Sequence, residues 1–120
     1  AMGALIDDLI DRGLWKNTLL ILMGEFGRTP TISGQGQPGR NHWTKCWSLS
    51  LGGCGLKEGL VIGSTNDDGT DLTDRPVTIH DLFCTFYKTL DINPYKELEF
   101  ENRPIPFVED KLGKPMGEVL

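Results

Sequence analysis

Apolar residues along the chain follow two patterns, which predict a helix near each end and a buried strand between them. Residues 4–14 repeat apolar side chains at helical spacing with aspartates on the opposite side, so they predict an amphipathic helix. Residues 18–23 form an apolar run without alternation, which is typical of a parallel strand buried on both faces. Helical spacing returns over 79–90, where Thr78 is the expected N-cap. Helix followed by buried strand predicts an α/β fold.

The segments between these elements predict shorter strands and loops. Alternation over 43–51 predicts a second strand, and 60–62 predicts a short third one. The S-G-Q-G-Q-P-G-R segment at 33–40 predicts a mobile loop. The proline-rich tail at 93–120 permits short extended pieces and an edge hairpin, and we expect it to wrap the core rather than join it. We expect a single domain over residues 1–120.

Composition and charge narrow the classes of function. The 120 residues are 38% hydrophobic and 24% charged, with a formal net charge of -5 and no Lys/Arg run that would neutralise nucleic-acid phosphates. We therefore expect no nucleic-acid partner. The longest apolar run, at 19–23, is far too short to cross a bilayer, and we expect no membrane span. Cys46, Cys54 and Cys84 contain no C-x-x-C pair, so we interpret them as buried small hydrophobic residues.

Polar residues directly after the predicted strand at 18–23 form a first candidate site. Glu25 and Arg28 lie in G-E-F-G-R-T-P at 24–30, at the carboxyl end of that strand, where open α/β sheets bind ligands. The alternative is that Glu25 and Arg28 pair with each other and neutralise a half-buried turn. Their spacing does not separate these two hypotheses.

His42 is the second candidate. It lies in G-R-N-H-W at 39–43, before the predicted second strand, and neutral imidazole is a common metal ligand. A single His is more often a solvated or capping residue. A carboxylate and a His at neighbouring strand ends nevertheless suit zinc, manganese or iron.

Two other polar clusters have structural interpretations. His80 and Asp81 open the second helix, where such residues are typical of capping. The N-D-D-G sequence at 66–69, with Asp71, lacks the D-x-D-x-D-G order and the distal Glu of a calcium loop. We therefore expect a plain acidic turn there.

Motifs spread over essentially the whole chain resemble one bacterial family, the domain-of-unknown-function family 1501. They are N-T-L-L-I-L-M-G-E-F-G-R-T-P at 17–30, G-R-N-H-W at 39–43, L-G-G-C-G-L-K-E-G at 51–59, P-V-T-I-H-D-L at 76–82, N-R-P-I-P at 102–106 and G-E-V-L at 117–120. Members of this family look like sulfatases and alkaline phosphatases. The resemblance therefore implies the C-terminal part of an alkaline-phosphatase-like fold, with a mixed, mostly parallel sheet flanked by helices.

The resemblance also implies a metal site. In the wider superfamily an Asp-His pair at a strand end binds one metal ion, and a downstream His binds another. Glu25 matches that Asp and His42 matches the downstream ligand, so a divalent metal such as zinc is expected on these two residues. Phe26 replaces the His of the pair, and its phenyl ring has no lone pair to offer a cation.

Oxyanion binding is the second implied role. Arg28 and Arg40 are expected to hold a sulfate or phosphate group, because a planar guanidinium binds such groups with two parallel hydrogen bonds. Asn41 is placed with them, and it stands where the family usually has Asp. The substitution removes one negative charge near the expected metal.

The resemblance implies a metal-dependent hydrolase of sulfate or phosphate esters as the intact parent protein, whose family members often carry export signals. The superfamily's nucleophile and other metal ligands lie on N-terminal segments outside this chain, so the piece alone is expected to be inactive. One alternative is a non-catalytic domain that binds carbohydrate or protein, with Trp43 and Trp47 as a stacking surface. Another is a structural role in a longer chain. An unpaired strand edge predicts a homo-oligomer or association with the missing N-terminal segments.

Overall fold

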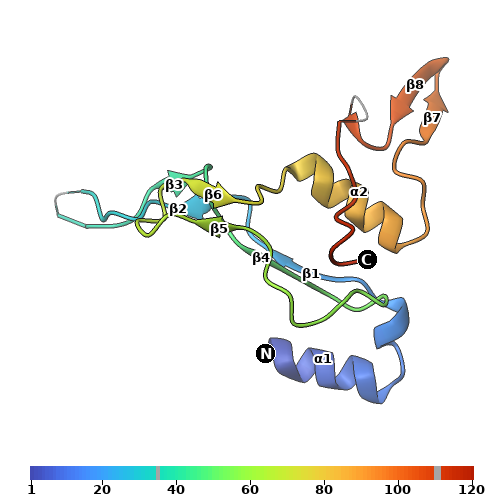
Figure 1. Cartoon of the computed structure of the whole chain (residues 1–120), viewed down its shortest axis with the longest axis horizontal. Coiled ribbons are helices and arrows are strands. Elements are labelled where there is room, and N and C mark those ends of the chain that lie inside the picture. Colours follow the sequence, from blue (N-terminus) through green and yellow to red (C-terminus); the bar gives the residue numbers. More distant parts are fainter. Residues whose placement is uncertain (35, 110–111) are drawn as a thin grey trace. The chain divides into compact units, whose positions relative to one another are not determined.

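The chain forms short strands and two helices within residues 1–34, 36–109 and 112–120, which a computed structural model describes (Figure 1). The elements in chain order are α1 (Met2–Asp11), the 3-10 helix η1 (Trp15–Asn17), β1 (Leu20–Met23), β2 (Gly27–Arg28), β3 (His42–Trp43), β4 (Leu49–Gly52), β5 (Ser64–Thr65), β6 (Leu72–Asp74), α2 (Ile79–Thr89), β7 (Glu97–Phe100) and β8 (Arg103–Pro106). The chain divides into two compact units. Unit 1 contains Ala1–Leu20, Leu51–Leu60 and Val77–Leu120, and unit 2 contains Ile21–Ser50 and Val61–Pro76.

The strands pair only two by two in the described part of the chain. The pairs β2–β3, β5–β6 and β7–β8 are antiparallel, and β1 pairs with β4. The predicted C-terminal part of an alkaline-phosphatase-like fold, with a mixed, mostly parallel sheet flanked by helices, is therefore wrong. Small antiparallel sheets and two short helices take its place.

The physical reason lies in the apolar run that was expected to be buried on both faces. Only Leu20–Met23 of this run is a strand, and the Leu22 side chain is 53% exposed. The second predicted strand is divided between β3 and β4, with a bend and irregular backbone at 44–48 between them. Residues 60–62 are not a strand, and Val61 is 94% exposed. Apolar runs indicated extended backbone, but nothing in them determined which element would cover it.

The buried side chains of the described residues all lie in unit 1. They are Leu56, Leu82, Cys84, Thr85, Pro94, Val108, Met116 and Val119. The tail contributes part of this core, contrary to the expected wrap, because Met116 N–H donates to the buried Thr85 hydroxyl over 2.9 Å. Lys57 N–H donates to the Val119 carbonyl over 2.9 Å. This bond joins the end of the tail to the segment that follows β4.

Helix α2 confirms the predicted N-cap and the capping role of Asp81. The Thr78 hydroxyl accepts from Asp81 N–H at 3.1 Å, and the Asp81 carboxylate accepts from Thr78 N–H at 3.0 Å. These reciprocal bonds form a capping box, which satisfies N–H groups that the first helical turn leaves unpaired. The other oxygen of Asp81 accepts from Lys114 N–H at 2.9 Å, so the cap also fixes the tail.

Helix α1 and the cysteines depart in part from their expected burial. Helix α1 has no buried residue, and its apolar side chains remain partly or fully exposed. Cys84 is buried as predicted, whereas Cys46 and Cys54 are only half-buried. Among the described residues, no helix is long and apolar enough to cross a bilayer, in agreement with the sequence.

Candidate functional site

The β2–β3 hairpin brings the predicted site residues into one short part of unit 2. Its two strands place Arg28 opposite His42 and Gly27 opposite Trp43. The pairing continues beyond β2, where Thr29 N–H donates to the Asn41 carbonyl over 2.9 Å. A hairpin therefore brings the candidate residues together, whereas the ends of parallel strands were expected to do so. The candidates lie in the two strands or directly beside them. All of them are exposed: Glu25, Arg28, Arg40, Asn41 and His42.

Gly27 is the residue that permits this hairpin to close tightly. A Cβ atom at this position would overlap the Cys46 carbonyl oxygen and would lie 3.1 Å from the Trp43 carbonyl oxygen. Only glycine allows the backbone of β2 to approach the following segment so closely. The G-E-F-G-R-T-P motif therefore has a structural requirement for its second glycine.

Phe26 lies at the centre of the site. Its ring stacks against the His42 imidazole with ring centroids 3.9 Å apart and an angle of 32° between the planes. The Arg28 guanidinium carbon lies 5.6 Å from the centroid of the same ring, within range of a cation–π contact. Phe26 supplies no metal ligand, but it contacts two of the candidate side chains, His42 and Arg28.

Arg40 fixes the loop that connects the two strands. Its Nη1 donates to the carbonyl oxygens of Thr29 and Pro30, each over 2.9 Å. The Nε–H and Nη2–H groups have no acceptor among the residues that the structure describes. Arg40 is thus held in place by one side of its guanidinium while the other side can donate to a ligand.

Asn41 also supports the loop. Its Nδ2 donates to the Ser33 hydroxyl over 2.9 Å, and its N–H donates to the Thr29 hydroxyl over 3.0 Å. Ser33 and Gly39 bridge the two sides of the loop as well. The side-chain nitrogen of Asn41 therefore supports the loop, which leaves the side-chain oxygen Oδ1 for other contacts.

Glu25 is exposed and does not pair with Arg28 in the described part of the chain, so the mutual neutralisation considered for the two residues is not observed. Within the same residues, no group of three or more His, Cys, Asp or Glu side chains is arranged to hold a metal ion. Zinc in proteins has three or four protein ligands. Glu25 and His42 do not fit a complete zinc site by themselves.

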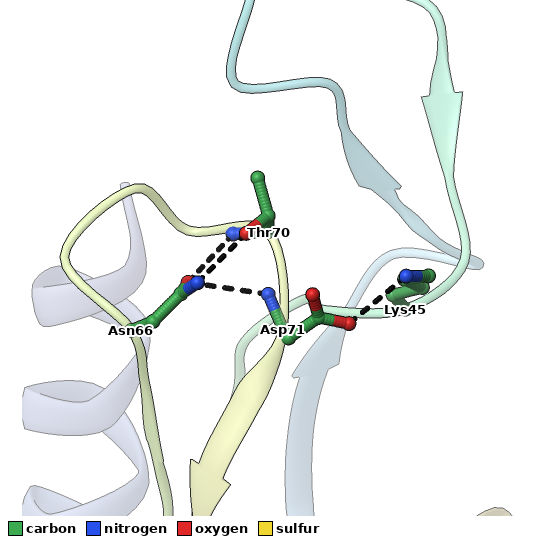
Figure 2. A network of polar contacts seen from close by, with 4 residues as sticks. All are labelled: Lys45, Asn66, Thr70 and Asp71. Carbon is green, nitrogen blue, oxygen red and sulfur yellow. Dashed lines mark hydrogen bonds and ion pairs between the residues drawn. The ribbon is translucent and has the colours of Figure 1, made fainter.

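The acidic turn between β5 and β6 is built around Asn66 (Figure 2). The Asn66 Oδ1 accepts from Thr70 N–H at 2.8 Å and from Asp71 N–H at 3.2 Å, while its Nδ2 donates to the Thr70 hydroxyl over 2.7 Å. Lys45 Nζ lies 2.9 Å from the Asp71 carboxylate and 5.5 Å from the centroid of the Trp43 ring. This turn agrees with the plain acidic turn expected from the sequence, and its ion pair joins the β5–β6 hairpin to the site.

Phe26 and the loop contacts of Arg40 are the parts of the site that sequence reasoning missed. Phe26 was interpreted only as a lost ligand, and Arg40 only as an anion-binding residue. The signal that was available is the Gly- and Pro-rich segment between two short motifs, which is typical of a hairpin loop. A hairpin would have predicted cross-strand contact between the two motifs.

Comparison with known proteins concerns the whole chain. The family model described as a protein of unknown function (DUF1501) matches residues 1–120. The chain belongs to the DUF1501 family. No curated protein and no solved structure matches this DUF1501 chain. The predicted membership of family 1501 is therefore confirmed.

Proposed function

We propose that this DUF1501 chain, as part of a longer protein, binds the sulfate or phosphate group of an ester in a metal-dependent hydrolase related to sulfatases and alkaline phosphatases. The observation that supports the proposal is the β2–β3 hairpin, which gathers two arginines, a histidine and a carboxylate on an exposed segment. Guanidinium groups are suited to such oxyanions because they donate two parallel hydrogen bonds. The proposal concerns the chemistry of the hairpin and does not depend on a parallel sheet.

Arg28 and Arg40 are the proposed oxyanion-binding residues. The hydrogen bond from Arg28 Nη1 to the Arg40 carbonyl is long, at 3.5 Å, so the Arg28 guanidinium has donors available for an anion. Arg40 has Nε–H and Nη2–H available on the side away from its carbonyl contacts. Because those contacts already hold Arg40 in place, it loses little conformational entropy when an anion binds.

Glu25 and His42 are the proposed metal ligands contributed by this chain. A divalent metal such as zinc would polarise the ester oxygen and balance its charge. Its other ligands would have to come from segments outside this chain. The Thr29 hydroxyl near the site donates to the Thr31 carbonyl, and the Ser33 hydroxyl accepts from Asn41, so neither is paired with a base. The chain alone is therefore proposed to be inactive.

Sulfate binding tests the proposal directly. We expect sodium sulfate to shift the NMR signals of the Arg28 and Arg40 side chains in the purified chain. Arg28→Gln should weaken sulfate binding about tenfold, because it removes a charge-assisted contact. If His42 is a metal ligand, zinc should tighten sulfate binding in the wild type and not in His42→Ala.

Arg103→Gln is the matched control, because Arg103 is an exposed arginine on strand β8 of unit 1. It should bind sulfate as the wild type does. Equal weakening by Arg28→Gln and Arg103→Gln would show that sulfate responds only to net charge. That result would contradict an oxyanion site at the hairpin.

A non-catalytic binding domain is the second candidate function. It is favoured by Phe26, which occupies the centre of the site where the resemblance expects a ligand, and by the lack of a three-ligand cluster in the described residues. Trp47 is exposed and could stack on a sugar, whereas Trp43 is half-buried against Lys45. Absence of specific sulfate binding in every sample would favour this candidate over the hydrolase.

A further inference from the structure

Phe26 contacts two candidate side chains that lie opposite each other on the β2–β3 hairpin. The register pairs Arg28 with His42, and paired residues of antiparallel strands carry their side chains on the same face. The Phe26 ring stacks on the His42 imidazole with ring centroids 3.9 Å apart. The Arg28 guanidinium carbon lies over the same ring, 5.6 Å from its centroid. One ring therefore lies against both side chains on this face of the hairpin.

The two arginines of the hairpin are held in different ways. Arg40 Nη1 donates to the carbonyl oxygens of Thr29 and Pro30, each over 2.9 Å. Arg28 Nη1 donates only to the Arg40 carbonyl, over 3.5 Å, which is close to the limit for a hydrogen bond. Among the residues that the structure describes, Arg28 forms no ion pair. The contact with Phe26 is therefore the main restraint on the Arg28 guanidinium.

Such a restraint matters for binding an anion at Arg28. A free arginine side chain populates many rotamers, and ordering it costs conformational entropy. An anion that selects one rotamer loses this amount from its affinity, unless another contact already favours that rotamer. Backbone carbonyl groups supply such contacts to Arg40. For Arg28, the described residues offer the ring of Phe26.

Stacking on a ring does not compete with anion binding. A guanidinium is planar, and its N–H donors lie in that plane while its face stacks on aromatic rings. The negative face of the ring attracts the cation. The Arg28 N–H groups can therefore donate to a sulfate or phosphate oxygen while the contact with Phe26 is kept.

We propose that Phe26 is a positioning residue of the oxyanion site, whose ring holds the Arg28 guanidinium in the orientation that binds a sulfate or phosphate group. The stack on His42 restrains the ring in turn. This inference rests on the proposed function of the hairpin, because it needs an anion at Arg28. It gives Phe26, which stands where the resemblance expects a histidine ligand, a role in anion binding instead of metal binding.

Substitutions at Phe26 separate the role of the ring from simple packing. Phe26→Leu keeps an apolar side chain but has no aromatic face. It should weaken sulfate binding to the purified chain about threefold, the factor expected for one exposed cation–π contact. Phe26→Tyr keeps the ring and should bind sulfate as the wild type does. Equal weakening in both variants would overturn the proposal.

NMR signals of the arginine side chains distinguish positioning from a change of the hairpin itself. A proton that lies over an aromatic ring is shifted upfield by the ring current. In Phe26→Leu the Arg28 side-chain signals should therefore move downfield, while the Arg40 Nε–H signal stays in place, because carbonyl oxygens hold Arg40. Movement of both sets of signals would assign Phe26 to packing of the hairpin and would contradict a positioning role.

A fluorinated ring keeps the test decisive if leucine disturbs the hairpin. Pentafluorophenylalanine at position 26 keeps the shape and apolar character of the ring, but its fluorines withdraw the negative charge from the ring face that attracts the cation. It should weaken sulfate binding about as much as Phe26→Leu does. Sulfate binding equal to that of the wild type would show that the face of the ring has no effect on Arg28.

Phe100→Leu is the matched control, because Phe100 is an exposed phenylalanine of unit 1. It should bind sulfate as the wild type does. If Arg28→Gln weakens sulfate binding and neither Phe26→Leu nor the fluorinated ring does, the oxyanion site stands and the positioning role of Phe26 fails. If the wild type binds no sulfate, the proposed function fails and the positioning role fails with it.

Discussion

At the residue scale, Gly53 illustrates how a single missing side chain permits a close contact. It has a φ of +80°, and a Cβ atom there would overlap the Thr18 carbonyl oxygen and lie 3.1 Å from the Trp15 carbonyl oxygen. The next residue, Cys54, donates its N–H to that Trp15 carbonyl over 3.1 Å. The turn after β4 is therefore held directly against η1, and this contact requires glycine.

Gly53→Ala is expected to lower the free energy of unfolding by about 3 kcal/mol, from the left-handed backbone and the steric overlap together. Gly55→Ala is the control, because Gly55 has a similar φ of +78° but nothing within 4 Å of the added methyl group. It should lose only about 1 kcal/mol. Urea denaturation measures both, and equal losses would show that the overlap at Gly53 relaxes freely.

Individual residues also show how far the sequence predicts the site. The candidate residues could be grouped from their motifs, because each motif is a short local segment: Glu25, Arg28, Arg40, Asn41 and His42. The role of Phe26 could not be predicted in this way. Its contact with His42 depends on cross-strand register, which no single motif contains.

At the element scale, the start of α2 carries the strongest local signal in the chain. The Thr78 hydroxyl accepts from Asp81 N–H at 3.1 Å and lies 2.7 Å from the Asp81 carboxylate. Thr78→Ala should lower the free energy of unfolding by about 1 kcal/mol, because one N–H of the first turn loses its acceptor.

Thr78→Ser provides the comparison for this prediction. Serine retains the hydroxyl, so its stability in urea denaturation should stay close to that of the wild type. If Ser and Ala were equally destabilising, the methyl group of Thr78 rather than its hydroxyl would be responsible for the loss.

Elements whose signal is local were predicted well, and elements that depend on a distant partner were not. Helix α2 was placed correctly because helical spacing and its cap lie within one segment. The β5–β6 hairpin falls where only a loop and a turn were expected, because its strands Ser64–Thr65 and Leu72–Asp74 are mostly polar and too short to show alternation. The parallel sheet was wrong because the apolar run at Leu20–Met23 carries no information about its neighbours.

At the scale of the whole molecule, unit 1 contains two acids that fold in their neutral form, the buried Cys84 and Tyr95, which is 38% exposed. Burial, followed by the charge of Asp81, raises the pKa of the Cys84 thiol above its ordinary 9.0. Burial, followed by Cys84 itself, raises the pKa of the Tyr95 hydroxyl above its ordinary 10.0. Tyr95 donates to the Gly113 carbonyl over 3.0 Å, so both groups lie where the tail meets α2. Deprotonation of either group therefore opposes folding.

The stability of the chain should consequently fall in alkali. Because both pKa values are higher in the folded state, the stabilisation is complete below pH 9.0 and is lost as the pH rises from 9.0 through the raised pKa values. In Cys84→Ala only Tyr95 remains, so the decline should begin nearer pH 10.0. Urea denaturation across this range measures the onset, and an identical onset in both proteins would contradict the role of Cys84.

The prolines of β8 have a further consequence, for the self-association of the chain. Fibrils grow because each added molecule presents a new strand edge to the next one. If two copies of the chain joined their hairpins through the exposed strand β7, the product would be one four-stranded sheet. The product would expose β8 on both sides, where Pro104 and Pro106 offer no N–H to another strand. Polymerisation through this hairpin would therefore terminate at two molecules instead of extending into a fibre.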